Sequence, residues 1–280
     1  FNYIRNSVKA VVNAYDGTMN FYVFDENDPL IKSYAEIFPS LFDDKSNMSE
    51  DLLNHIRYPE DLFTIQSDMY RDHHMTDPRV FYADEDPWVI PTDSSTTPRL
   101  ATLRGEFSEI GFKPMLPYYL LMSLPGESDL SYLIFQPFNP ENRPNMQSFL
   151  VADADPENYG QIIDFKLPKG EFVDGPTQVA TRINQDPDIS QIFTLLDQQG
   201  SSVIKGNLFV VPINQSVLYY QPIYLQGEQN PLPEFKFVVV VFQDRIIMAE
   251  SLTLALECVF GDLEIDLDLD VYDTEDISAI

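Results

Sequence analysis

The chain has 280 residues, of which 44% are hydrophobic and 13% aromatic, and its formal net charge at pH 7 is −28. This composition is typical of a globular protein, and a chain of this length can bury roughly three quarters of its unfolded surface. An acidic surface repels phosphate backbones and anionic lipid head groups, so we expect no nucleic-acid partner. A membrane-spanning helix needs about 18 consecutive apolar residues, and no apolar run in the sequence is that long.

The first third of the sequence predicts alternating helices and turns. Residues 3–14 carry apolar side chains at helical spacing, which predicts a helix. Residues 16–17 predict a turn, and residues 18–24 alternate as a strand does. Residues 28–38 begin with Asp-Pro and predict a second helix, because proline at the first helical position loses no hydrogen bond. Pro59 and the carboxylates after it predict a longer helix that runs to residue 73.

The middle of the chain is less regular. Asn47 and Glu50 form a loose capping box before a short helix. Residues 84–117 contain five prolines and the polar run TDSSTTP, which predicts a long loop or a mobile excursion. Residues 117–168 then contain four apolar runs with turn residues between them, and these predict an antiparallel meander. The runs are PYYLLMSLP, SYLIFQPF, SFLVADAD and IIDFKLP.

The last third predicts helices on both sides of further strands. Residues 175–200 predict a helical pair that Gly200 ends. Strand character returns at residues 202–213, 216–226 and 235–247. A final helix is expected at residues 251–261, and its Cys258, the only cysteine, is expected to be a buried, inert thiol.

These elements predict an α+β fold with a mainly antiparallel sheet and flanking helices. We expect residues 1–261 to form one soluble domain, and a division into two lobes near residues 92–116 is the alternative. Residues 262–280 form an acidic tail or an edge strand, since DLEIDLDLD alternates acidic and apolar residues without a break.

The segment from His55 to Pro91 is the densest in polar and aromatic residues, because it holds all three histidines and the only tryptophan. A hydrolase cleft lined by this segment would use acid–base groups. The candidates are Glu60, Asp61, His73, His74 and Asp77. His73 and His74 are adjacent and would point apart, and no zinc-binding spacing is present.

Two acidic clusters could supply oxygen ligands to Ca²⁺. Asp84, Glu85 and Asp86 stand in a turn before a Pro-Trp pair, where they could equally cap a helix or remain solvated. In the tail, three aspartates share one face if the tail is a strand, and a cation would relieve their mutual repulsion. They are Asp266, Asp268 and Asp270. Apart from calcium, we expect no cofactor.

No motif for nucleophilic catalysis is present. The sequence contains no GxSxG, no Cys-His pairing signature and no phosphate-binding glycine loop. Ser123 lacks the flanking glycines of a nucleophile elbow. The chain is therefore more consistent with a non-enzymatic protein than with an enzyme.

Several long motifs stand out in the sequence: YIRNSVKAVVNAYDG, HIRYPEDLFTIQ, HHMTDPRVFYADEDPW, PYYLLMSLPGE, the NM of RPNMQSFLVA, and QGSSVIKGNLFVVPI. In this combination the chain resembles an uncharacterised family of large bacterial membrane proteins, and the resemblance extends from Phe1 to Gly261. Members of this family have several transmembrane helices near the N-terminus and a large soluble region after them. The resemblance implies no activity, substrate or catalytic residue.

The resemblance implies that this chain belongs to the soluble region, outside the cytoplasm, of a protein anchored in the cell membrane by segments absent from this chain. A start at Phe-Asn-Tyr without an initiator Met agrees with an excised or processed piece. Three hypotheses follow. The chain is a binding module that takes a protein partner or assembles with itself near the membrane, a calcium-binding module, or a hydrolase.

Overall fold

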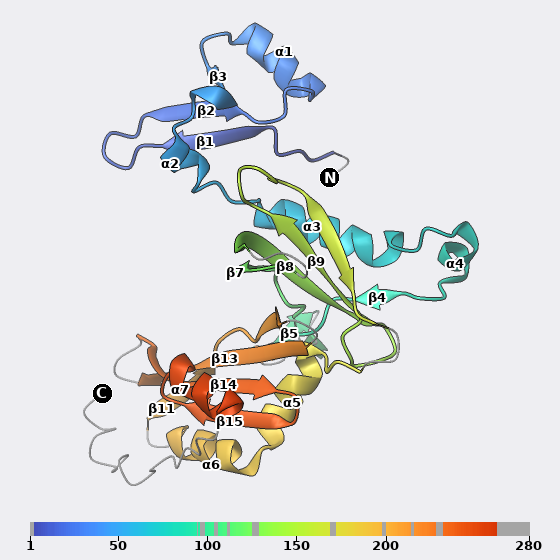
Figure 1. Ribbon diagram of the computed structural model, residues 1–280, viewed down its shortest axis with the longest axis vertical. Coiled ribbons are helices and arrows are strands. Elements are labelled where there is room, and N and C mark those ends of the chain that lie inside the picture. Colours follow the sequence, from blue (N-terminus) through green and yellow to red (C-terminus); the bar gives the residue numbers. More distant parts are fainter. Residues whose placement is uncertain are drawn as a thin grey trace.

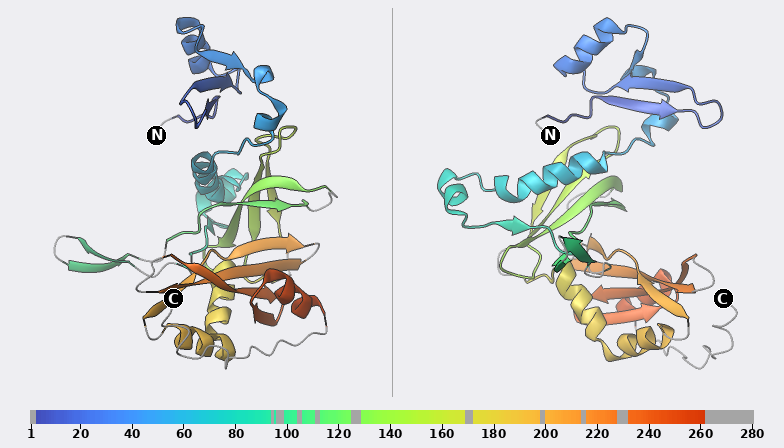
Figure 2. Two further views of the ribbon diagram at one scale, coloured as in Figure 1. Left: turned by 90° about the vertical axis from the view of Figure 1, so that its left-hand side faces the viewer. Right: turned by 180° about the vertical axis from the view of Figure 1, so that it is seen from behind.

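The computed structural model describes residues 3–93, 95, 99–103, 106–110, 113–124, 129–168, 172–197, 200–213, 216–227 and 232–261. Three parts follow one another along the long axis of the molecule (Figures 1 and 2): an N-terminal lobe, a central sheet covered by one long helix, and a C-terminal sheet with helices on both faces. The predicted α+β class is confirmed, and all strand pairs but one are antiparallel among the described residues. No described helix is both long and apolar enough to cross a membrane.

The N-terminal lobe, residues 3–57, contains a three-stranded sheet and short helices. Its elements are β1 (Val8–Val12), β2 (Met19–Val23), α1 (Pro29–Ile37), β3 (Phe42–Asp44), the 3-10 turn η1 (Lys45–Asn47) and α2 (Glu50–Leu53). The predictions of a strand after residue 18 and of a helix after Asp28 are confirmed.

Two local predictions in this lobe are wrong. Residues 3–14 do not form a helix, because β1 pairs antiparallel with β2. The spacing of the valines fits both structures, and β-branched side chains favour a paired strand. The predicted capping box is also wrong, because Ser49 caps α2 by accepting a hydrogen bond from the Leu52 N–H at 3.4 Å.

The central part is a meander with a helix on one face. Its elements are α3 (Glu60–His73), α4 (Pro78–Ala83), β4 (Trp88–Val89), β5 (Arg99–Leu103), β6 (Glu106–Ile110), β7 (Tyr118–Met122), β8 (Ser131–Pro140), β9 (Ser148–Asp153) and β10 (Ile162–Lys166). Strands β7 to β10 pair in chain order, as predicted, and β4 adds to β8. Side chains of β8 alternate between two cores, since Ile134 and Phe138 face α3 while Leu133 and Phe135 face the C-terminal part.

The prediction that residues 84–117 are an irregular loop is wrong in part. Two strands, β5 and β6, form a separate antiparallel hairpin in this region. Its base is closed by backbone hydrogen bonds from the Asp93 N–H to the Lys113 carbonyl at 2.7 Å and from the Met115 N–H to the Pro91 carbonyl at 2.8 Å. The prolines therefore flank regular structure instead of preventing it.

The C-terminal part is a sheet between helices. Its elements are α5 (Pro176–Gln185), α6 (Pro187–Leu196), β11 (Ser201–Lys205), β12 (Phe209–Ile213), β13 (Ser216–Gly227), β14 (Glu234–Phe242), β15 (Arg245–Ala249) and α7 (Leu252–Phe260). Each of the predicted long strands at 202–213 and 235–247 is two strands. Val239 and Val241 of β14 face α5 and α6, whereas Val238 and Val240 face α7, where Cys258 is buried as expected.

One hydrophobic core joins the central and C-terminal parts. It collects side chains of β7 to β9, α5, α6 and β12 to β15. A second core, between α3 and the central sheet, contains Phe63 and Trp88 together with Leu150. Residues on both sides of the 92–116 segment therefore share one core. The acidic tail, residues 262–280, lies outside the described residues.

Candidate functional site

The five acid–base candidates of the hydrolase hypothesis do not come together. Glu60 and Asp61 are exposed in the first turn of α3, and His73 is exposed in its last turn, about 20 Å away along the helix axis. Asp77 caps α4 by accepting a hydrogen bond from the Arg79 N–H at 2.8 Å. These side chains line no common cleft in the described part of the chain.

His74 is placed differently, because it is buried against Trp88. The two rings are stacked with centroids 3.6 Å apart. Its Nδ1 lies 3.3 Å from the carbonyl oxygen of Tyr70, and its Nε2 lies 3.8 Å from a carboxylate oxygen of Asp86. Within the described structure neither His74 Nε2 nor Trp88 Nε1 has a hydrogen-bond partner. The two aromatic rings serve mainly to pack α3 on the sheet.

A polar cluster beside Trp88 fixes α3 to the edge of the central sheet. The Tyr70 hydroxyl donates a hydrogen bond to Asp164 Oδ2 at 2.8 Å, and the Ser148 hydroxyl donates to Asp164 Oδ1. Lys166 Nζ lies 3.7 Å from the same carboxylate and 5.6 Å from the Trp88 ring. Burial and the neighbouring Asp164 raise the pKa of Tyr70 above its ordinary value. This arrangement holds the helix against the edge of the sheet.

The acidic cluster proposed for calcium is an exposed helix end. Asp84 ends α4 in the left-handed conformation, with φ of 52°, and Glu85 and Asp86 are exposed beside it. Across the described ranges, no three His, Cys, Asp or Glu side chains are grouped so that they could hold a metal ion. Asp266, Asp268 and Asp270 lie outside those ranges, so calcium binding stays a prediction.

The N-terminal lobe carries an exposed apolar surface. Five large apolar side chains follow one face of α1 and the turn after it, and each is between 44% and 62% exposed. We call them the α1 surface: Leu30, Tyr34, Ile37, Phe38 and Leu41. Their spacing is that of an amphipathic stripe that normally faces a core, yet in α1 only Ile31 is buried.

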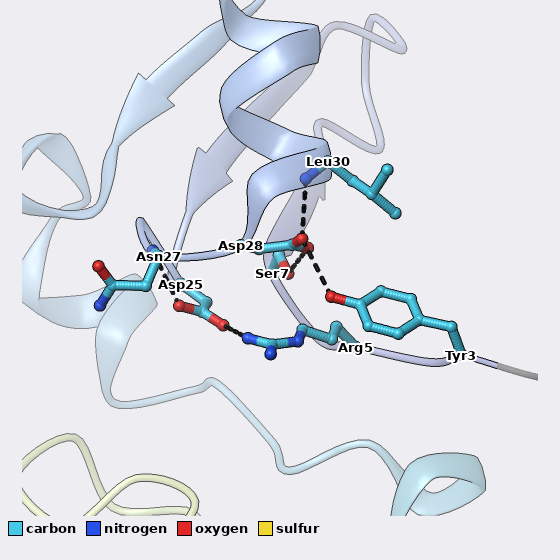
Figure 3. Close-up of polar contacts among 7 residues, drawn as sticks. All are labelled: Tyr3, Arg5, Ser7, Asp25, Asn27, Asp28 and Leu30. Atoms are coloured by element: carbon cyan, nitrogen blue, oxygen red, sulfur yellow. Dashed lines mark hydrogen bonds and ion pairs between the residues drawn. The ribbon is translucent and has the colours of Figure 1, made fainter.

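A polar network holds α1 to the start of the chain. Asp28 caps the helix by accepting a hydrogen bond from the Leu30 N–H at 3.0 Å. Figure 3 shows the same carboxylate directed at the hydroxyls of Ser7, at 2.5 Å, and Tyr3, at 3.2 Å. The hydrogen bond from Ser7, followed by that from Leu30, lowers the pKa of Asp28. The helix is therefore positioned by its polar end, which leaves its apolar stripe available.

The lobe has little core of its own. Among its described residues only three large hydrophobic side chains are buried, Tyr22, Ile31 and Met48, and none of the three hydrophobic clusters includes a lobe residue. Folded units of about 50 residues are only marginally stable unless something else covers their apolar surface. The lobe therefore needs contacts beyond its own residues.

Contacts between the lobe and the central part are mostly polar and aromatic. Asn6 donates a hydrogen bond to the Tyr159 hydroxyl at 2.8 Å. The Tyr159 hydroxyl in turn donates to the Arg57 carbonyl at 3.1 Å, and Lys9 Nζ lies 4.9 Å from the centre of the Tyr159 ring. Burial at this junction lowers the pKa of Lys9 to about 8.

The chain thus has an α+β fold with an exposed apolar surface on a small N-terminal lobe. It belongs to the uncharacterised protein family UPF0182, whose family model matches residues 1–196.

Bacterial relatives agree with this assignment. The chain is 50% identical over 261 residues to a UPF0182 protein of Desulforamulus reducens, and 48% identical over 261 residues to one of Pelotomaculum thermopropionicum. A UPF0182 protein of Geobacter sulfurreducens is 46% identical over 261 residues. Each alignment covers 93% of this chain but only 27% of the relative, so the chain corresponds to part of a larger protein. No solved structure matches the chain.

Sequence reasoning did not identify the α1 surface, although its signal was present. The helix predicted over residues 28–38 already carried Leu30, Tyr34 and Ile37 at helical spacing. Such a stripe predicts an apolar face, and it does not say whether the chain itself covers that face.

Proposed function

We propose that this chain is a non-enzymatic binding and assembly module of a larger bacterial protein, and that it docks through the α1 surface onto the remainder of the same polypeptide. The observation that carries the proposal is the exposed apolar stripe of α1 on a lobe with few buried side chains of its own. The family resemblance adds the context of an extracytoplasmic region beside the membrane part of its parent protein.

The size of the stripe supports a docking role. Burying one large apolar side chain completely contributes about 1.5–3 kcal/mol. The five residues of the α1 surface are each about half exposed, so covering all of them would contribute roughly 5 kcal/mol by the same area relation. This is enough to order a tethered lobe, because two parts of one chain associate without most of the entropy cost that separate molecules meet.

The length of the relatives points to the occupant. This chain spans 27% of the relatives it matches, so the larger part of such a protein is available to cover the stripe. A separate partner protein or a second copy of the chain would have to meet the full entropy cost of association.

The proposal can be tested by joining the chain to the remainder of its parent polypeptide through a flexible linker, so that their association stays intramolecular, and measuring the docking equilibrium. The double substitution Tyr34→Ser/Ile37→Ser is expected to weaken binding at least tenfold, which is about 1.4 kcal/mol. The matched control is Met69→Ser/Leu121→Ser, since these apolar side chains are equally exposed but lie on α3 and β7.

Wild-type and control chains are expected to bind the remainder with the same affinity. Equal binding by the α1 variant would overturn the proposal. A dimer of the chain that disappears in the α1 variant, measured by light scattering, would assign the surface to self-association instead.

A further inference from the structure

A groove in the C-terminal part has the lining of a small-ligand site. Its volume is about 460 Å³, within the range of about 300–1,000 Å³ common for such sites. One wall is α6, where Ser190, Phe193 and Thr194 follow one helical face. The other wall is β11, where Val203 and Lys205 share one side of the strand. Asn184 and Asp197 complete the lining.

The groove lies between elements that the fold fixes firmly. The buried residues of α6, Ile189, Ile192 and Leu196, belong to the main hydrophobic core. Strand β11 pairs along its length with β13. Figure 1 shows α6 and β11 in the part of the molecule farthest from the N-terminal lobe. The groove is therefore preformed and independent of the α1 surface.

Lys205 is the charged centre of this groove. Its amino group lies 4.8 Å from the centre of the Phe193 ring and donates a hydrogen bond to the side-chain carbonyl of Asn184. Lys205 forms no ion pair with any carboxylate in the described part of the chain. This is notable in a protein with 45 acidic and 17 basic residues, where a lysine readily finds a counter-charge.

The surroundings of Lys205 disfavour its charge. Burial lowers its pKa, and the more distant Asp197 opposes that effect only in part. A lysine ammonium has three donors, and the Asn184 carbonyl takes one of them. An anion in the groove would restore the missing counter-charge and accept the remaining hydrogen bonds.

We propose that this groove binds a small organic carboxylate, with the carboxylate on Lys205 and the apolar part of the ligand against Phe193 and Val203. The Ser190 hydroxyl lines the wall beside that position and can select among ligands by hydrogen bonding, whereas the Thr194 hydroxyl already donates to the Ser190 carbonyl at 2.8 Å.

The probe for this site is 3-phenylpropionate, and the neutral control ligand is 3-phenylpropanol. Chemical-shift titration of the full chain is expected to show saturable shifts of the groove residues, with a dissociation constant of about 1 mM, which corresponds to a modest −4.1 kcal/mol. The alcohol is expected to bind at least tenfold more weakly. Bound carboxylate is also expected to raise the pKa of Lys205, followed through its side-chain carbon resonance.

Two lysine variants separate a ligand site from a structural contact. Lys205→Met is expected to lose binding at least tenfold while its thermal midpoint stays equal to or above that of the wild type, because a half-buried unpaired charge is removed. Lys236→Met is the matched control, since Lys236 lies 3.9 Å from Glu234 and outside the groove.

Three results would overturn the proposal. The first is the absence of saturable shifts up to about 10 mM ligand, ten times the expected dissociation constant. The second is equal binding of the acid and the alcohol, and the third is unchanged binding by Lys205→Met. If the wild type binds no ligand and Lys205→Met has a lower thermal midpoint, the role of Lys205 would be structural, to hold Asn184 and α5 in place.

Discussion

The hydroxyl of Tyr70 should make a measurable contribution to stability. It donates a hydrogen bond at 2.8 Å to Asp164, whose side chain is only 11% exposed. A hydrogen bond to a charged group contributes about 1.5–3 kcal/mol. Tyr70→Phe should cost the lower part of that range, about 1.5–2 kcal/mol, because Ser148 and Lys166 still contact the carboxylate.

Thermal and urea unfolding at pH 7 measure this effect. For a chain of this size the loss should lower the melting temperature by about 3–8 °C. Tyr82→Phe is the control, because Tyr82 is 94% exposed, and it should leave the melting temperature unchanged. If Tyr70→Phe were as stable as the wild type, the cluster that fixes α3 to the sheet would not exist as described.

Three further predictions concern other parts of the molecule. Burial lowers the pKa of Lys9 from 10.5 to about 8, so above pH 8 the unfolded chain holds a proton on this lysine that the folded chain has lost. The free energy of unfolding, measured by urea titration, should therefore rise between pH 8 and 9.5. Lys9→Met should abolish that rise. Gly175→Ala should lower the urea midpoint strongly, since a Cβ there would lie 1.9 Å from the Pro144 carbonyl oxygen and overpacking costs about 1–3 kcal/mol or more. Millimolar calcium should not shift the melting temperature of a chain truncated after Gly261, because no three His, Cys, Asp or Glu side chains are grouped to hold a metal ion in the described part of the chain. A calcium-specific rise that only the full chain shows would belong to the acidic tail.

Elements whose signals are local were predictable from the sequence. The helix after Asp28 was predicted because a capping aspartate and a proline at the first helical position act within one turn. The helix after Pro59 was predicted from the proline and from the two carboxylates in its first turn, which interact favourably with the helix dipole. The meander of β7 to β10 was predicted because each strand is a short apolar run between turn residues. Helix α4 carries the same Asp-Pro start, at Asp77, and that signal could have identified it.

Features that depend on strand pairing or on tertiary packing were not predicted. Residues 8–12 satisfy helical spacing and strand propensity together, and antiparallel pairing with the adjacent strand β2 decides between them. The crowding of carboxylates and histidines between residues 55 and 91 did not become crowding in space, because α3 separates Glu60 from His73 by its whole length. His74 turned inward to Trp88 instead.

The two candidate binding surfaces illustrate the same limit. The stripe of α1 is visible in the sequence, but its exposure follows from the small size of the lobe. The groove at Lys205 joins side chains of α5, α6 and β11 that all lie within residues 184–205, but the sequence does not show that β11 folds back beside α6. Both surfaces required the tertiary arrangement to be seen.

Hydrogen exchange on α1 is the most direct test of the docking proposal. The measurement compares peptides covering residues 29–41 in the isolated chain and in the complete parent protein, with peptides of α3 as the internal reference. If the remainder of the polypeptide covers the α1 surface, exchange at residues 29–41 should slow at least tenfold in the complete protein while α3 is unchanged. Equal exchange in both proteins would contradict the proposal that the α1 surface is a docking site for the rest of the chain.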